Sequence, residues 1–432
     1  MSDVDLAIVG GGAAGLMTAI TAGRAARERG RAPRIVLVDG ARTLGAKILV
    51  SGGGRCNVTH VAVSERDFNG STPAAIRRVL RRFPASATVA FFAELGVPLV
   101  EEPTGKLFPA SNRARDVLHA LLGEAGRVGV EIRHPWRVVS LAPGTEGFTL
   151  VSADEASLRA RRVVVATGGR SLPKSGSDGS GYDLVASVGH TVTPTGPALV
   201  PLCLDASAAP LMALSGLSTT AMLEVRRGTG RRLHRVRGDV LFTHFGVSGP
   251  AVLDISRHFL TSRRDDPSTT LVADWLSGEG AERVNAALRS LGGETVGSWL
   301  RARVPERLTR VLCERAGVSP GCTGHELSKV ERTALVRSAC EMPLPVTGDR
   351  GYAFAEVTSG GVPLKELRLE SMESRLVEGL YLAGEICDVD GRIGGFNFQW
   401  AWASGYVAGV ALGAAPMAPL VKARPDPRQG KT

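Results

Sequence analysis

Six residues near the amino terminus have the types and spacing of a nucleotide-binding turn. The run Gly10-Gly11-Gly12-Ala13-Ala14-Gly15 fits the pattern G-x-G-x-x-G. In this pattern the first glycine permits a tight turn, the second lets the backbone approach a pyrophosphate, and the third lets a helix pack closely on a sheet. The amides at a helix start also attract a negative phosphate. We therefore predict a dinucleotide cradle at Gly10, Gly12, Ala13, Ala14 and Gly15.

The flanking segments strengthen this prediction, because the glycine pattern alone is weak evidence. An apolar run, Val4–Val9, precedes the turn, and an alanine-rich helical stretch of about Ala14–Arg29 follows it. The next apolar run ends at Asp39, which completes a β-α-β unit of the usual size. The Asp39 carboxylate can accept hydrogen bonds from ribose hydroxyls and disfavours a 2′-phosphate. The alternative is a glycine-rich turn without a ligand.

Three further segments favour FAD over NAD. Lys47–Asn57 contains three successive glycines, which suggest backbone passing close to a flat ligand or a phosphate. Val163–Gly169 is an apolar strand that ends in Thr-Gly-Gly, and Gly384-Glu385 and Gly394–Asn397 come near the carboxyl terminus. A simple NAD dehydrogenase does not need to contact its dinucleotide again so late in the chain. A long, extended cofactor such as FAD needs contacts from such distant segments.

The elements that must position these residues divide the chain. Residues 64–130 are expected to be largely helical, and strands return before Gly169. Leu202–Ile255 is expected to form short strands, and residues 280–340 helices. We predict an α/β fold with a discontinuous Rossmann-like FAD-binding domain over residues 1–195 and 350–415. An inserted β-barrel-plus-helical domain is predicted over 196–349, and a flexible tail over 416–432.

The composition excludes several classes of protein. The six cysteines are scattered through 432 residues without a C-x-x-C pair, so neither a disulfide framework nor a metal site is predicted. The start lacks a signal-peptide pattern, and there is no apolar run of roughly 18 residues. We therefore expect a cytoplasmic protein without a membrane span.

The net charge of +10 and a pI of about 9.7 leave two interpretations open. Arginines can be spread over solvated faces, or they can attract an anionic partner such as ribosomal RNA. Aromatic residues make up only 5% of the chain, which leaves few platforms on which single-stranded bases could stack.

Four segments carry a resemblance to a known family: Gly45–Thr59, Ala166–Tyr182, Leu241–Ser256 and Leu380–Gly405. They resemble the HI0933-like flavoproteins, also called YhiN-like or BaiN-like, of the two-dinucleotide-binding-domain superfamily. The resemblance spans almost the whole chain and implies non-covalent FAD. It places Lys47 and Ser51–Asn57 along the ribityl chain and isoalloxazine, and the backbone of Val138 at the adenine. Glu385 would bind ribityl hydroxyls, and the helix beginning near Asn397 would direct its positive end at the flavin N1–C2=O edge.

The cofactor contacts that follow from the motif and the resemblance together form a set of residues spread over the whole first domain. The set is Gly10, Gly12, Ala13, Ala14, Gly15, Asp39, Lys47, Ser51, Gly52, Gly53, Arg55, Cys56, Asn57, Val138, Ala166, Thr167, Gly168, Gly384, Glu385, Asp388, Gly394, Gly395, Phe396 and Asn397. No second strand-GxGxxG-helix unit is present, so NAD(P)H is expected to dock only transiently as electron donor.

The resemblance implies reduction of a conjugated C=C bond in a small molecule or a nucleobase, such as a uridine of ribosomal RNA. Two alternatives are a flavin oxidase or dehydrogenase of a small amine or alcohol, and a non-catalytic flavin-binding protein. The candidate catalytic residues are His244 and Cys56, and both could instead be core packing residues. His60 is expected at the surface, and the oligomeric state stays open.

Overall fold

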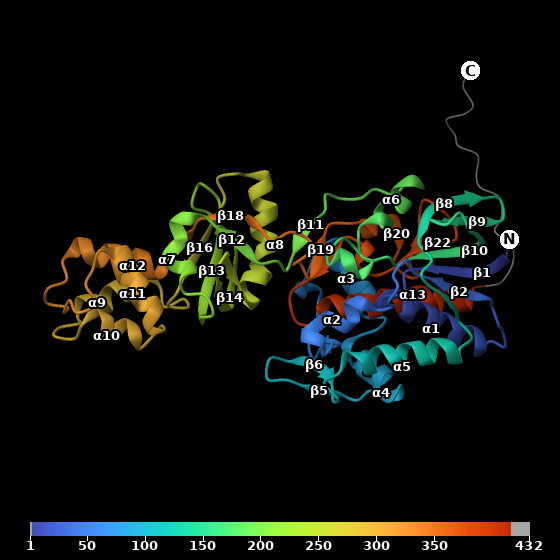
Figure 1. The fold of residues 1–432 in the computed structure, drawn as a ribbon, viewed down its shortest axis with the longest axis horizontal. Coiled ribbons are helices and arrows are strands. Elements are labelled where there is room, and N and C mark those ends of the chain that lie inside the picture. The colour runs from blue at the N-terminus through green and yellow to red at the C-terminus, as the bar shows by residue number, and fades with distance from the viewer. Residues whose placement is uncertain (1, 416–432) are drawn as a thin grey trace, which may run out of the picture. The chain divides into compact units, whose positions relative to one another are not determined.

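The computed structural model describes residues 2–415, without the side chains of the first two, and divides the chain into two compact units. Unit 1 comprises the chain up to Thr195 and again from Val357, and unit 2 is Gly196–Glu356 (Figure 1). The sequence placed the return to the first domain at residue 350, and the structure places it at Val357. The tail predicted over 416–432 lies outside the described residues.

Unit 1 is built on a nine-stranded mixed sheet. Its five parallel strands follow the order β22-β10-β1-β2-β7. Their bounds are β1 Ser2–Val9, β2 Ile35–Val38, β7 Glu131–Arg133, β10 Ser157–Val165 and β22 Leu380–Leu382. The antiparallel members are β8 Val138–Gly144, β9 Gly147–Ser152, β20 Leu367–Arg368 and β21 Glu373–Ser374. The order reverses at β1, with β2 and β7 on one side and β10 and β22 on the other. This confirms the predicted Rossmann-type α/β fold.

Three long helices pack together beside this sheet: α1 Ala13–Arg27, α5 Ala114–Arg127 and α13 Phe396–Ala414 (Figure 1). α13 is apolar on all sides and buried along most of its length, as expected of a helix inside a large protein. Its glycines Gly405, Gly409 and Gly413 recur every four residues and lie against the backbone of α1. Small residues at this spacing let two helix backbones approach closely.

The other helices and strands of unit 1 are shorter. The helices are α2 Ala46–Gly54, α3 Pro73–Leu80, α4 Ala85–Glu94 and α6 Ser180–Ser187. The strands are β3 Thr59–His60, β4 Phe68–Gly70, β5 Leu99–Glu101, β6 Lys106–Pro109, β19 Val357–Ser359 and β23 Val389–Gly391. The prediction that residues 64–130 are largely helical was therefore incomplete. Within that range β5 and β6 pair with each other, and β6 also pairs with β3, which precedes it. Strands this short are too brief for their alternation to be recognised in the sequence.

Unit 2 has its own core and its own antiparallel sheet, in the order β17-β16-β13-β14-β15-β12-β18. The strands are β12 Leu202–Leu204, β13 Ser218–Arg226, β14 Arg232–Thr243, β15 Gly246–Ser248, β16 Thr270–Asp274, β17 Met342–Leu344 and β18 Val346–Asp349. Only Pro345 separates β17 from β18. β17 pairs with β16 and β18 pairs with β12, so one short segment supplies the first and the last strand of this order.

The helices of unit 2 are α7 Ala209–Met212, α8 Pro250–Asp265, α9 Ala281–Arg289, α10 Val296–Arg301, α11 Glu306–Ala316 and α12 Lys329–Cys340. The last four confirm the helices predicted over 280–340. The prediction of strands throughout Leu202–Ile255 was wrong at its end, because α8 begins at Pro250. Proline at the first helical position has no amide to leave unsatisfied and a φ suited to a helix.

Candidate functional site

The parallel strands of unit 1 end at one edge of the sheet, and the predicted cofactor segments follow them directly. Gly10 follows β1, Asp39 follows β2, and Ala166 follows β10. Gly384 comes two residues after β22. In open α/β sheets, ligands bind at the carboxyl edge where the strand order reverses, which here is between β1 and β10. Four segments that are far apart in the sequence therefore meet at the expected place.

The glycine turn after β1 has the close contacts that the motif predicts. A Cβ on Gly10, where φ is +111°, would lie 2.3 Å from the carbonyl oxygen of Ala166, and a Cβ on Gly15 would lie 1.8 Å from that of Gly10. At Gly12, by contrast, a Cβ would meet nothing within 4 Å. α1 begins at Ala13 without a side-chain cap. Its first amides therefore remain available for a phosphate beside open space.

The carboxylate of Asp39 is fixed by backbone amides. One oxygen accepts a 2.6 Å hydrogen bond from the amide of Gly11, and the other accepts a 2.6 Å bond from Ala41. The carbonyl of Asp39 also accepts a hydrogen bond from the Trp136 amide at 2.6 Å, which holds the chain leading to Val138 beside this turn. An ionised carboxylate has about four acceptor positions, so Asp39 can still accept from ribose hydroxyls.

Lys47 and Glu385 contact each other directly, which the sequence did not predict. The Lys47 ammonium lies 2.6 Å from one Glu385 oxygen and 2.7 Å from the hydroxyl of Ser171. The other Glu385 oxygen accepts bonds from the Thr358 amide at 2.9 Å and the Ser171 hydroxyl at 3.0 Å. Ser171 and Thr358 are buried, and they complete a cluster that sequence reasoning missed. The sequence pointed only to Ser171, because it lies within the Ala166–Tyr182 motif.

The glycine run after Lys47 interrupts α2. Ser51 has an extended ψ of 148°, and Gly52, Gly53 and Gly54 have φ of +56°, +69° and +85°. These left-handed conformations favour glycine and leave the three residues exposed. Arg55 then lies over the ring of Phe108, with 4.1 Å from its guanidinium carbon to the ring centroid. The turn thus presents backbone, with no side chain in the way, to a neighbouring ligand.

Cys56 is fully buried. Desolvation raises the pKa of its thiol to about 12, partly opposed by a hydrogen bond with Ser51. Burial also raises the pKa of the Cys387 thiol. Both thiols are therefore protonated at neutral pH and lie among apolar neighbours of the main core. This favours the packing interpretation of Cys56, and its role as a proton donor stays a prediction.

α13 holds both late glycine turns in place. The amide of Gly384 donates to the Ser404 hydroxyl at 2.9 Å, and its carbonyl accepts from the indole of Trp400 at 3.0 Å. At the start of the helix, Gly395 has a φ of +91° and α13 has no side-chain cap. In the amide orientation that satisfies both partners, the Asn57 oxygen accepts from the Gly395 amide at 3.0 Å. The N-terminus of α13 is therefore positioned against the glycine run of residues 51–57.

The Phe396 side chain is buried rather than directed outward. The ring of His60 stacks on it, with 4.9 Å between centroids. His60 was expected at the surface, and it is partly exposed there with its ring over Phe396. Asn397 bonds to both backbone groups of Gly391 at 2.8 and 3.0 Å. Any contact of Phe396 with a cofactor would therefore be made by its backbone.

The other predicted residues with an individual role are Thr167, Val138 and His244. The hydroxyl of Thr167 is buried without a hydrogen-bond partner among the residues that the structure describes, so it has capacity for a ligand. Val138 is buried at the start of β8. His244 belongs to unit 2, where it is exposed at the turn between β14 and β15 with its ring edge-to-face on Phe245 at 5.1 Å.

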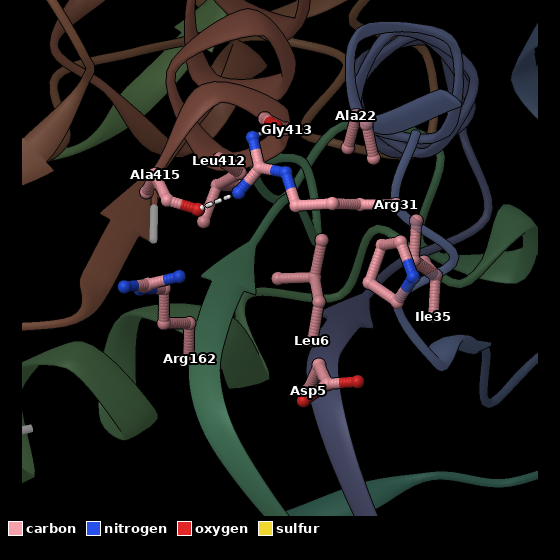
Figure 2. Close-up of a pocket in the computed structure, with 11 residues that line it drawn as sticks. Asp5, Leu6, Ala22, Arg31, Ile35, Arg162, Leu412, Gly413 and Ala415 are labelled. Carbon is pink, nitrogen blue, oxygen red and sulfur yellow. Dashed lines mark hydrogen bonds between the residues drawn. The ribbon is translucent and has the colours of Figure 1, made fainter. Parts of the chain in front are cut away.

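A hollow at the opposite, amino edge of the sheet is not part of this site (Figure 2). It is lined mainly by apolar side chains from β1, β2, α1 and the end of α13. Arg31 closes it by donating to the carbonyls of Gly413 and Ala415, both at 2.5 Å. Since ligands of open α/β sheets bind at the carboxyl edge, we interpret this hollow as an anchor for α13.

No helix in residues 2–415 is long and apolar enough to span a membrane. No group of three or more His, Cys, Asp or Glu side chains there could hold a metal ion.

Comparisons with known proteins find relatives that match almost the whole chain. A family model described as the HI0933-like protein Rossmann domain matches residues 4–411. A 3-dehydro-bile acid delta(4,6)-reductase of Clostridium scindens is 35% identical over 415 residues, which cover 95% of this chain and 99% of the relative. A ribosomal RNA dihydrouridine synthase of Escherichia coli is 33% identical over 417 residues, covering 96% and 99%. A solved 3-ketosteroid-delta4-(5alpha)-dehydrogenase of Rhodococcus jostii matches with a TM-score of 0.47 and 15% identity, covering 96% of this chain and 97% of that one.

Proposed function

Because the chain belongs to the HI0933-like family and is an FAD-dependent oxidoreductase, we propose that it reduces an activated carbon–carbon double bond with electrons from NAD(P)H. Two relatives support this reaction class. One is named a reductase of a 3-dehydro bile acid, and the other a dihydrouridine synthase of ribosomal RNA. An unsaturated 3-keto steroid and uridine share a double bond conjugated to a carbonyl. In both cases the reduction adds a hydride to the β-carbon and a proton to the α-carbon.

The observation that carries the proposal is the meeting of four segments at the carboxyl edge of unit 1, around uncapped helix starts and free cysteines. All six cysteines are free, and four of them are buried. No disulfide among the described residues is therefore available to accept electrons from a reduced cofactor, which supports an external substrate as the electron acceptor. The free thiols also support a reducing cytoplasmic location.

The residues of the chain would bind and orient FAD, which supplies hydride transfer when it is bound. The amides at the start of α1 would hold the diphosphate, and Asp39 the adenosine ribose. Lys47 and Glu385 would fix each other beside the ribityl chain. The uncapped start of α13 would place positive partial charge near the flavin ring. His244 and Cys56 stay the predicted proton donors, and NAD(P)H would dock transiently.

The substrate is proposed to be a nucleobase of ribosomal RNA, with a small enone as the alternative. The name of the Escherichia coli relative and the net charge of +10 favour the RNA substrate. The bile-acid reductase, which is 35% identical to this chain, supports a small enone as the substrate.

The decisive test is anaerobic mixing of the purified yellow protein with NADPH or NADH while the flavin absorbance is recorded. We expect rapid bleaching, followed by recovery of the colour when a soluble enone is added. Hydrogen peroxide formation with a small amine or alcohol, in place of enone-dependent recovery, would point to an oxidase. Ribosomal RNA from a deletion strain should lack one dihydrouridine, and a normal content would exclude the RNA substrate.

A further inference from the structure

One hairpin of unit 2 concentrates positive charge. Between residues 226 and 237, where β13 turns into β14, the sequence contains six arginines and no acidic residue. They are Arg226, Arg227, Arg231, Arg232, Arg235 and Arg237. We propose that this arginine hairpin, residues 218–243, binds the phosphate backbone of base-paired RNA. The inference deepens the proposed function and rests on it, since it assigns unit 2 a role in holding an RNA substrate.

The alternation of β14 directs two of these arginines to the open face of the sheet. Arg235 and Arg237 are exposed, whereas Leu223 and Val225 on β13 are buried on the opposite face in the core of unit 2. α8 packs against both strands, with His258 stacked on His234 of β14 at 3.5 Å between ring centroids. Residues two apart on a strand are about 7 Å apart. The backbone positions of Arg235 and Arg237 on the open face are therefore spaced similarly to phosphates along a nucleic-acid strand.

Only part of this charge is neutralised within the protein. Glu224 pairs with Arg226 at 2.7 Å and Arg232 at 3.1 Å. The other acidic residue of the hairpin, Asp239, accepts a hydrogen bond from Thr220 at 2.7 Å.

Three arginines keep their charge free for a partner. Glu224 lies opposite Arg235 in the ladder but pairs with Arg226 and Arg232, and within the described part of the chain no carboxylate lies within ion-pairing distance of Arg231, Arg235 or Arg237. Free guanidinium groups on a solvent-facing sheet bind phosphate oxygens in a bidentate manner better than an ammonium would.

The surroundings favour base-paired RNA over other anionic partners. The one aromatic residue of the hairpin other than histidine, Phe242, is fully buried, so the hairpin has no aromatic platform for single-stranded bases. The large apolar side chains exposed in the described residues all lie outside the hairpin. A membrane-binding surface would need such residues to enter the lipid interface. Contacts to phosphates and shape are the usual way that double-stranded RNA is recognised.

The test is the salt dependence of RNA binding by the full holoprotein. A fluorescent, fully paired RNA hairpin is titrated at several salt concentrations with the wild type and with R231Q/R235Q/R237Q. Each phosphate contact contributes about one unit to the slope of log affinity against log salt. We expect the triple variant to lose about two to three units of slope and roughly tenfold or more in affinity at physiological salt.

The matched control removes the same charge from unit 1. Arg81, Arg82 and Arg115 are exposed arginines of that unit, and R81Q/R82Q/R115Q should keep the wild-type slope within about half a unit. The proposal is overturned if the hairpin variant retains the wild-type slope, or if both triple variants lose it equally. Tighter binding to anionic lipid vesicles or to a poly-glutamate peptide than to the RNA hairpin would also overturn it.

Enone reduction separates this inference from the proposed function. Both triple variants should reduce a soluble enone at the wild-type rate, because neither set of arginines includes a residue assigned to cofactor binding. If no protein reduces the enone while the hairpin variant still loses its salt slope, the proposed reaction fails and the RNA surface stands. If the enone is reduced and the slope is unchanged, the surface fails and the reaction stands.

Discussion

Lys47 and Glu385 are 338 positions apart in the sequence, yet their side chains form a charge-assisted hydrogen bond of 2.6 Å at the cofactor edge. Their side chains are 25% and 17% exposed, so water screens the pair only partly. Ser171 forms hydrogen bonds with both partners, and the Thr358 amide donates to the glutamate. Both charges therefore have polar partners in place of water. Such a pair fixes geometry more than it stabilises the fold, because desolvation offsets much of its attraction.

We expect Glu385→Gln to lower the free energy of unfolding of the apoprotein by roughly 1–3 kcal/mol, since it leaves the Lys47 ammonium without its carboxylate. It should also weaken FAD binding by about tenfold or more. Urea unfolding and a fluorescence titration with FAD measure the two effects. In a double-mutant cycle, adding Lys47→Met should restore part of the lost stability.

The control for this cycle is the exposed pair Arg310–Glu306, whose side chains are 71% and 42% exposed. Arg310→Gln should change stability by less than about 0.5 kcal/mol. Strictly additive effects of the Lys47 and Glu385 substitutions would show that the pair is not coupled.

The buried thiols give the protein a defined response to pH. Burial raises the pKa of Cys56 and of Cys340 from 9.0 to about 12, so folding favours the protonated thiol. Unfolding then releases protons at alkaline pH, and stability should fall as the pH rises from about 9 towards 12. Cys56→Ala should flatten this decline. Urea unfolding midpoints between pH 7 and 10.5 measure it, and an identical decline in both proteins would contradict the assigned burial.

The same burial predicts which cysteines react. At pH 8, a thiol-specific aromatic disulfide should label only Cys203 and Cys322, which are half-buried, in the native protein. The four buried thiols should react only after unfolding. Rapid labelling of Cys56 in the folded holoprotein, detected by peptide mass spectrometry, would instead support its predicted role as a proton donor.

At the scale of elements, α13 connects the two ends of the chain. Its glycines pack on α1, whose start is the predicted diphosphate site. In the first turn of the helix, Gln399 accepts hydrogen bonds from Thr59 at 2.6 Å and Thr88 at 2.8 Å, and it donates to the carbonyl of Phe83 at 2.8 Å. The helix that directs its amino end towards the cofactor edge is therefore held by both its small residues and its polar ones.

Gly409→Ala tests this packing. A Cβ at Gly409 would lie 1.9 Å from the hydroxyl of Thr21 and 2.6 Å from the carbonyl oxygen of Thr18. Alanine stabilises an isolated helix by about 1 kcal/mol relative to glycine, but the clash forces the backbones apart. We expect a net loss of about 1–3 kcal/mol in stability, together with weaker FAD retention.

Gly123 in α5 is the matched control, because it is exposed and a Cβ there would meet nothing within 4 Å. Gly123→Ala should raise stability by roughly 0.5–1 kcal/mol. If chemical denaturation shows that both alanine variants are more stable than the wild type, then α13 does not pack closely on α1 at Gly409.

At the scale of the whole molecule, the sequence predicted what depends on local pattern. Gly10 to Gly15 and Asp39 define a β-α-β unit by spacing, and the change of character near residue 195 marks the start of an insertion. The Lys47–Glu385 pair and the Ser171 and Thr358 hydroxyls were not predictable. Each depends on which distant segments meet, and a single sequence does not contain that information.

The two units also have separate hydrophobic cores, which predicts that they can be separated. The ends of unit 1 meet at the junction: the Thr193 amide bonds to the Gly361 carbonyl at 2.9 Å, and a Cβ on Gly360 would lie 2.5 Å from the Pro194 carbonyl oxygen. A short Gly/Ser linker from Thr195 to Val357 should therefore close unit 1 at a small entropic cost. We expect this shortened protein to fold and to be yellow. It should bind the RNA hairpin with a flatter salt slope than the whole chain.

Unit 2, expressed alone as residues 196–356, should be colourless, unfold cooperatively in urea and keep the salt slope of the whole chain. Because its sheet and helices enclose their own core, its fold does not require FAD. The intact chain and its R231Q/R235Q/R237Q variant are the references. If isolated unit 2 unfolds without a transition, or if unit 1 alone carries the full RNA affinity, the division of labour between cofactor unit and RNA-binding unit is wrong.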